Sequence, residues 1–236
     1  MQQTIAPKLS SLIVDGDLAM GLFAVTGTYV GAFLSRTVYT SGSGNHTTGA
    51  KTRRIRVTCV GGGGTGGWCN VAGSGAGGGG GGGTAKKDFA VSPSTAYAYV
   101  VGIKGNHGTI GSPGTQPTDA SASTFIVGGT TLSGGGGLHG VATDPAATYG
   151  AGGAGGAATN GDLNIGGAAG FYGTINAAAL RGGQGGSSSL GGGALASAAA
   201  VGIAGALYGG GGSGSSATAQ YGGDGASGCV IVEEYA

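Results

Sequence analysis

The chain has 236 residues, 62 of them glycine, and its net charge at neutral pH is +1. Glycine makes up about 7% of an average protein. Disordered chains are poor in apolar residues and rich in charge, whereas this one is 39% hydrophobic and 8% charged. Ordinary disorder is therefore a poor fit, and the near-zero net charge argues against nucleic acid as the main partner.

The first 27 residues are predicted to be a separate segment. They do not read as a secretion signal, because Lys8 stands alone and Asp15 and Asp17 interrupt the place where an apolar core belongs. The uncharged run from Leu18 to Leu34 is diluted by glycine and threonine and is too short to span a bilayer. We therefore expect no membrane insertion.

Three segments of the remaining chain are predicted to be strands: residues 29–41, 53–60 and 229–235. The first is β-branched and aromatic and ends at a Ser-Gly-Ser-Gly-Asn turn signal. The second, "RRIRVTCV", alternates apolar and polar residues, which is typical of a half-buried strand. Its basic face is interpreted as the solvated face of an edge strand rather than a polyanion site. The third, "CVIVEEY", is expected beside the second in one sheet.

Two hairpins are predicted between these strands. In "KKDFAVSPSTAYAYVVG" the turn is at Ser92-Pro93-Ser94, and alternation of apolar and polar residues continues on both sides. In "STFIVGGTTLSG" the two-residue turn is Gly128-Gly129. Strand-forming pieces therefore surround the glycine tracts.

Residues 61–228 hold 55 of the 62 glycines. They show no strict Gly-X-Y register, which excludes collagen, and Ala, Ser and Gly cannot build a conventional core. Their backbones can approach closely, either as polyproline-II-like segments or as irregular loops. The alanine-rich stretch "ALASAAAVGIAGALY" could form a helix, but Gly202 and Gly205 weaken it. The predicted fold is mainly β with an irregular glycine-rich body and little helix.

The sequence offers little for catalysis or cofactor binding. "GGGGTG" matches G-x-G-x-x-G, but no helix can follow it, and a P-loop lysine is missing. The histidines are far apart, and single Asp residues lie in turn-like settings. Cys59, Cys69 and Cys229 form neither a disulfide framework nor a zinc spacing. Buried free thiols are expected for Cys59 and Cys229, which lie in strand-like stretches. We predict no enzyme activity, no cofactor and no metal.

The order of these pieces resembles the glycine-rich domain that ends many bacteriophage tail-fibre and receptor-binding tail proteins. The resemblance rests on "IRVTCVGGGG", "GGGTAKKDFAVSPSTAYAYVVG", "RGGQGG", "YGGDGASG" and the closing "CVIVEEY", and it covers about residues 28–236. Three positions depart from the family pattern: Cys59 replaces valine, Pro93-Ser94 replaces Pro-Gly, and "NHTTGAKT" replaces an aromatic lead-in.

The resemblance implies a non-catalytic virion component, made in the host cytoplasm, at or near the tail tip. Its partners would be a host cell-surface polysaccharide or outer-membrane receptor, neighbouring tail proteins through residues 1–27, and further copies of itself in a trimer. The alternative is a structural tail or capsid decoration protein that does not touch the receptor. The glycine-rich domain would then be residues 28–236.

Aromatic residues that interrupt the glycine tracts, and polar residues near loop tips, are the candidates for receptor contact, since aromatic faces anchor interfaces at low entropy cost. They are Trp68, Asn106, His107, His139, Tyr149, Tyr172 and Tyr208. For Trp68, filling of a thin core is an equally open interpretation. Phe171 and Tyr221 are interpreted as core-filling residues.

Overall fold

The computed structural model describes residues 31–111, 114–143, 149–174, 180–198, 200–216 and 218–236. Within these ranges the regular secondary structure is β only. The strands are β1 (Phe33–Tyr39), β2 (Ser43–Thr47), β3 (Arg54–Val60), β4 (Thr84–Ala90), β5 (Ala96–Val100), β6 (Ser123–Val127), β7 (Thr130–Gly134), β8 (Ala158–Thr159), β9 (Leu163–Ile165) and β10 (Cys229–Tyr235). The prediction of a mainly β fold is confirmed. The proposed attachment segment, residues 1–27, lies outside the described residues.

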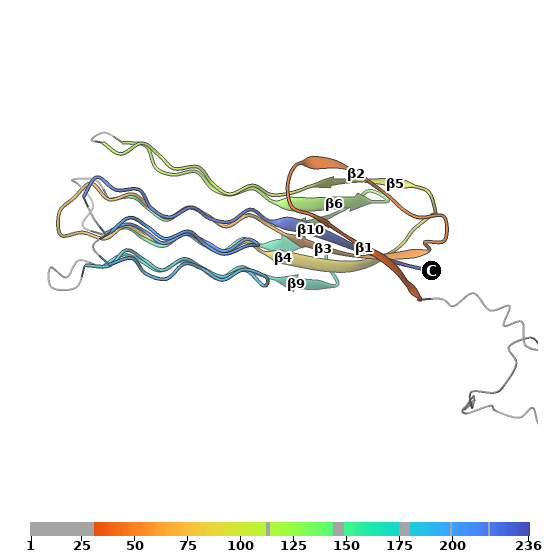
Figure 1. Cartoon of the computed structure of the whole chain (residues 1–236). Helices are drawn as coiled ribbons and strands as arrows, with labels where there is room; N and C mark the ends of the chain where they lie inside the picture. The colour runs from red at the N-terminus through yellow and green to blue at the C-terminus, as the bar shows by residue number, and fades with distance from the viewer. Residues whose placement is uncertain (1–30, 112–113, 144–148, 175–179, 199, 217) are drawn as a thin grey trace, which may run out of the picture.

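The strands form two antiparallel sheets at one end of the molecule (Figure 1). The first has the order β1-β10-β3-β4-β9 and the second β2-β5-β6-β7-β8. Cys229 pairs with Val60, so the strand that precedes the glycine tracts lies beside the strand that follows them, as predicted. The basic strand β3 lies between β10 and β4. Its interpretation as an edge strand is therefore wrong.

One of the two predicted hairpins is present. The hairpin predicted at Ser92-Pro93-Ser94 is wrong, because β4 and β5 on either side of this turn belong to different sheets, so the turn carries the chain from one sheet to the other. The second hairpin is confirmed, since β6 pairs with β7 through Gly128-Gly129. Both glycines of that turn have positive φ, 55° and 80°, the backbone of a type I′ hairpin turn. The alanine-rich stretch near residue 200 is not helical at any described position. Its glycines and exposed setting give a helix no apolar face to bury.

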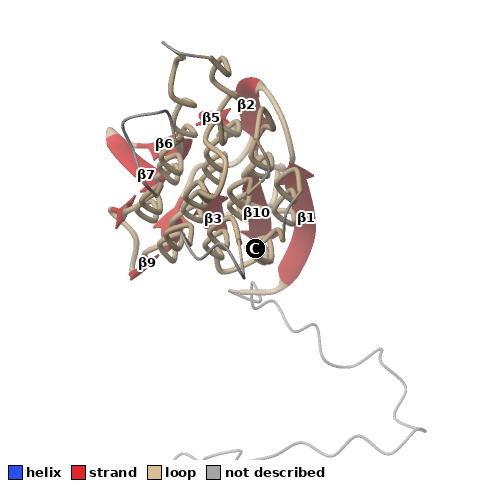
Figure 2. Cartoon of the chain, turned by 90° about the vertical axis from the view of Figure 1, so that its left-hand side faces the viewer, coloured by secondary structure: helices blue, strands red, loops and turns tan. Residues whose placement is uncertain are grey.

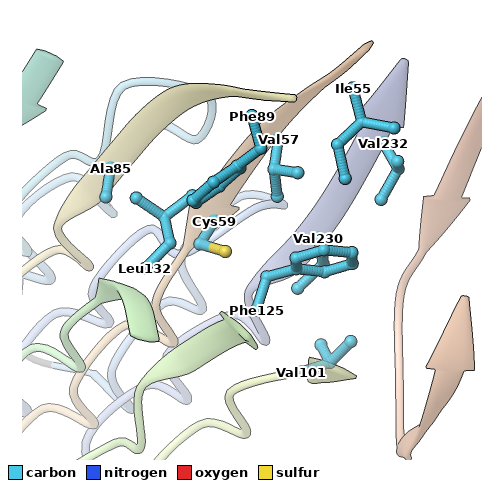
Figure 3. Close-up of a cluster of buried hydrophobic side chains, with 10 residues drawn as sticks. All are labelled: Ile55, Val57, Cys59, Ala85, Phe89, Val101, Phe125, Leu132, Val230 and Val232. Atoms are coloured by element: carbon cyan, nitrogen blue, oxygen red, sulfur yellow. The ribbon is translucent and has the colours of Figure 1, made fainter. Parts of the chain in front are cut away.

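The hydrophobic core lies between the two sheets (Figure 3). The alternation predicted for β3 is observed, since Ile55, Val57 and Cys59 are all buried. Phe125 of β6 and Leu132 of β7 face them from the second sheet. All three cysteines are free and buried. Burial raises the pKa of the Cys229 thiol to about 11, so this sulfur is protonated and unreactive at neutral pH.

The glycine-rich body is a bundle of extended segments that run away from the sheets (Figures 1 and 2). The N–H groups of segment 75–83 donate in turn to three neighbouring segments. Every third N–H group therefore donates to the same neighbouring segment. The bonds run from Gly77, Gly80 and Gly83 to Val141, Leu138 and Gly135; from Gly78 and Gly81 to Phe171 and Ala168; and from Gly79 and Gly82 to Gly212 and Gly209. Three residues per turn is the period of a polyproline II helix.

The carbonyl groups of segment 75–83 accept bonds from three further segments. The donors are Gly61, Gly64 and Gly67; Gly150, Gly153 and Gly156; and Gly183 and Gly186. Six neighbours among the described residues therefore surround this one segment. Such packing leaves no room for side chains: a Cβ on Gly78 would lie 2.1 Å from the carbonyl oxygen of Gln184. Hydrogen bonds between backbones thus replace a side-chain core along the bundle.

A buried ionisable pair joins the two sheets. Glu234 of β10 lies 3.3 Å from Nε2 of His46 on β2, and both residues are buried. The Tyr39 hydroxyl lies 3.0 Å from Nδ1 of His46. The carboxylate also accepts bonds from the Gly49 N–H at 2.8 Å and from the Thr52 hydroxyl. Every side of this buried charge thus has a polar partner, which is what burial of a carboxylate requires.

The pair predicts that the protein is less stable in acid. Burial lowers the pKa of His46 below its usual value, although Glu234 opposes the shift. Burial would raise the pKa of Glu234, but the bonds from Thr52 and Gly49 outweigh it and lower that pKa. The unfolded chain therefore binds protons more readily than the folded chain as pH falls through about 6.5 and then about 4.5. We expect the melting temperature to fall steadily from about pH 7 to about pH 4.

Thermal melts followed by circular dichroism would check this. His46→Gln should flatten the dependence between about pH 7 and pH 5. A melting temperature that is constant over this range, or that rises in acid, would contradict the assignment.

Candidate functional site: the tip of the bundle

The segments of the bundle run out from the sheets and back, so the connections between them meet at the end farthest from the sheets. We call this end the tip. Its described residues are 70–74, 109–111, 114–115, 149, 172–174, 181 and 218–221. Figure 2 looks toward this end, with the segments seen nearly along their axes. The direction of segment 75–83 shows which residues lie at the tip. Gly83 leads directly into β4 at the sheets, so Gly75, at the other end of the segment, lies at the tip.

Two of the predicted contact residues meet at the tip. Tyr149 and Tyr172 form an edge-to-face pair with ring centroids 6.4 Å apart. They are 52% and 65% exposed. Their backbones are held by the lattice beneath them, because the Gly173 N–H donates to Gly150 and the Gly150 N–H donates to Gly75. The pair therefore presents aromatic surface on a rigid support.

A second group lies on the flank of the bundle close to the tip. Nε2 of His107 is 2.5 Å from Asp224, which also accepts a bond from Lys104. The His107 ring lies 5.1 Å from the ring of Tyr221. Asn106 is exposed next to it, and its backbone bonds to Thr118. Asp224 thus pairs with the Lys104 ammonium group and orients the exposed histidine.

His139 belongs to neither group. It donates its backbone N–H to Asp119 at 3.0 Å, and its Nδ1 lies 2.7 Å from the same oxygen. Partial burial would raise the pKa of Asp119, but the two bonds from His139 outweigh it and hold the pKa below its usual value. Since both sides of the contact are satisfied locally, this pair serves to join segments 134–142 and 115–122.

Two predicted residues are not part of the exposed tip. Trp68 is 1% exposed, and its indole N–H donates to the Thr115 carbonyl at 2.8 Å. Of the two roles left open for it, the structure shows the packing one. Tyr208 lies in the turn at the sheet end of the bundle, where its carbonyl accepts a bond from the Ser188 hydroxyl at 2.5 Å. It is therefore distant from Tyr149 and Tyr172.

Sequence reasoning assigned two exposed aromatic residues to the core. Phe171 and Tyr221 are 59% and 43% exposed, and their interpretation as core-filling residues is wrong. Arg181 at the tip is also exposed and was not identified as a candidate. The sequence carries no signal for this exposure, because it does not show which residues of a glycine-rich segment face the solvent.

The described residues contain no group of three or more His, Cys, Asp or Glu side chains that could hold a metal ion. In the same part of the chain, no helix has the length and apolar character needed to cross a membrane. No clustered nucleophile and base appears at the tip among the side chains described above.

Comparison with known proteins is consistent with this architecture. No curated protein matches the chain. A family model described as a glycine-rich domain matches residues 39–235, a range that includes the bundle and every strand except β1, of which it covers only Tyr39. The chain belongs to this family of glycine-rich domains.

Proposed function

We propose that the chain is a bacteriophage tail protein, a tail fibre or tail-tip adhesin, which binds the surface of the host bacterium during adsorption without catalysis. One observation carries the proposal. The backbone lattice gathers the connecting loops at one end and exposes Tyr149 and Tyr172 there. Loops held on a rigid scaffold are the usual carriers of recognition.

The opposite end of the molecule suits attachment. The N–H of Gly31 donates to the carbonyl of Ala236 at 2.8 Å, so the described start of the chain lies beside its end, next to the sheets. A neighbouring tail protein held through residues 1–27 would therefore leave the tip free. Within the proposal, the protein resides in the virion tail and assembles as a trimer.

The tip favours a ligand with little charge. Arg181 is the one charged side chain among the described residues of the tip, and the rest of the surface consists of two exposed tyrosines and the polar backbone of residues 70–74. Tyrosine contributes large contact area with a polar hydroxyl at low entropy cost. A surface polysaccharide fits this chemistry best, and an exposed loop of an outer-membrane protein is the second choice.

Truncation of both tip tyrosines tests the proposal. The full chain should bind cells of a susceptible strain and compete with phage for adsorption. Tyr149→Ala combined with Tyr172→Ala should weaken cell binding at least about tenfold, because central aromatic anchors each contribute more than about 1 kcal/mol. Binding of labelled protein to cells, measured over a concentration series, gives the affinity.

Phe33→Ala is the matched control, since Phe33 is equally exposed but lies on β1 at the sheet end. It should leave cell binding unchanged. If an excess of the wild-type chain does not bind cells and does not reduce phage adsorption, the adhesin proposal is wrong. A structural tail or capsid decoration role would then account for the same fold.

A further inference from the structure

One flank of the bundle carries an uncharged apolar surface that the proposed function does not use. No charged residue occurs between Arg181 and Asp224. Within this stretch, residues 190–198 and 200–207 form outer segments of the bundle, and we call them the outer strip. Leu195 and Leu207 are 70% and 62% exposed, the highest values among the exposed aliphatic side chains of the described chain. Val201 and Ile203 are about half exposed.

The inner side of the outer strip is fully engaged. The Ala194 N–H donates to Gly211 at 2.9 Å, and the Ser213 N–H donates to Ile203 at 2.9 Å. Ala194 and Ser197 are buried against the bundle. The strip is therefore part of the rigid lattice, and its leucines are held outward by the three-residue period rather than left out of a loose loop.

Large and small side chains alternate on the outer side. The bond from the Ala206 N–H to the Gly192 carbonyl sets the register of the two antiparallel halves, which places Leu195 level with Ile203. At a rise of about 3.1 Å per residue, the next outward positions lie about 9 Å away along the axis. They hold small residues on both sides: Gly192 and Ala206 at one end, and Ala198 and Ala200 at the other.

This pattern fits a second copy of the same strip. Leu195 and Ile203 form a ridge across the strip, and the small residues on either side of them leave shallow grooves. One strip can therefore place its large side chains over the small residues of another. No like charges would meet, because the strip has none. Exposed contiguous apolar surface of this kind marks an interaction site in soluble proteins.

Two other surfaces of the molecule are less suited to such a contact. The outward face of the first sheet carries Arg36, Arg54 and Arg56 beside Glu233 and Asp88. The flank that bears Lys104 and Asp224 is also charged. A sugar ligand would gain little from an aliphatic strip, since the strip offers neither a flat ring nor a charged or amide side chain between residues 190 and 207.

We propose that copies of this chain associate through the outer strip, with Leu195 and Ile203 at the centre of the contact and Leu207 at its edge. The proposal specifies the surface for the self-association included in the proposed function. Because the strip lies on the flank and the tip lies at the end, association through the strip leaves Tyr149 and Tyr172 exposed. Each copy can then bind its ligand independently.

The test is the mass of the full chain in solution, measured by light scattering after gel filtration over a range of concentrations. The wild-type chain of 21.8 kDa is expected to run as a trimer. Leu195→Glu should weaken association at least about tenfold, because a charge would be buried without a partner at the contact. Leu207→Gln should act in the same direction with a smaller effect. Ile103→Glu, at a 60% exposed position on another flank, should leave the mass unchanged.

A circular dichroism melt of each variant verifies that it is folded, which is expected at such exposed positions. If the wild type is a dimer and Leu195→Glu dissociates it, the proposed contact surface is supported and only the expected trimer is wrong. A wild-type chain that is monomeric at every concentration would overturn the proposal, as would Leu195→Glu with the wild-type mass. If Leu195→Glu loses cell binding while the wild type is monomeric, the strip contacts the receptor and not another copy. Loss of cell binding with the oligomer intact would count against the adhesin function alone.

Discussion

Gly80→Ala is expected to cost about 3 kcal/mol or more of folding stability, although it adds a single methyl group. The new Cβ would lie 2.0 Å from the Ala154 carbonyl oxygen and 2.5 Å from its carbon. Ordinary contact needs more than 3 Å, so one backbone would have to move by about an ångström. Neither can, because Gly80 donates to Leu138 and accepts from Gly64 in the same lattice. The effect is therefore at or above the upper end of the range for overpacking a core.

Urea denaturation of the wild type and the variant, followed by circular dichroism, would measure this loss. The matched control is Gly192→Ala. Gly192 lies in an outer segment, has no heavy atom within 4 Å of a built Cβ, and does not have the positive φ that strains other residues. Alanine there should be neutral or stabilise by up to about 1 kcal/mol, because it restricts the unfolded chain. Equal stability of the two variants would show that the segments are not packed as described.

The sheets could be predicted from the sequence because they follow ordinary side-chain physics. In β3 the apolar residues alternate with charged ones, and this pattern alone fixes which face is buried. Val60 and Cys229 were expected to be close because a strand that closes a glycine tract needs a partner. The position of β3 within its sheet was harder to predict. Its basic face suggested an edge strand, but Arg54 and Arg56 form ion pairs with Asp88 on the neighbouring strand β4.

The arrangement of the bundle could not be predicted in the same way. A glycine such as Gly80 has no side chain whose polarity reports its surroundings, so the sequence shows no period of three within the tracts. The period exists in the backbone bonds, which join segments distant in sequence. Chain composition therefore indicated close backbone packing and left open whether it was regular.

The same reason explains the errors at the candidate site. Tyr149 and Tyr172 were selected because they interrupt glycine tracts, and they do meet at the tip. Phe171, which precedes Tyr172, met the same criterion and was assigned to the core. Only the orientation of segment 166–174 shows that Phe171 is exposed. For Trp68 the sequence left two roles open, and its surroundings come from residues more than 40 positions away.

Trp68→Ala is expected to cost about 3–5 kcal/mol, the range for removing a buried aromatic side chain. The ring is 1% exposed and lies directly against Gly114, where a built Cβ would be 2.6 Å from Cζ2. Its removal leaves a cavity between segment 61–69 and the hairpin in which segments 103–109 and 115–121 are hydrogen-bonded to each other. It also leaves the Thr115 carbonyl without the bond from the indole N–H, which adds about 1 kcal/mol or more.

The loss should be greatest near this hairpin. Hydrogen exchange at the Thr118 N–H, which donates to Asn106, should accelerate strongly in Trp68→Ala, while exchange at the Val57 N–H in the central strand β3 should change only with global stability. Trp68→Phe is the matched control, since it retains most of the ring and removes the indole bond, and it should lose about 1–2 kcal/mol. If Trp68→Ala were as stable as Trp68→Phe, the ring would not be packed, and Trp68 would again be available for contact at the tip. The wild-type emission spectrum offers a direct check, because the chain has one tryptophan: it should be blue-shifted when folded and move to the red on denaturation.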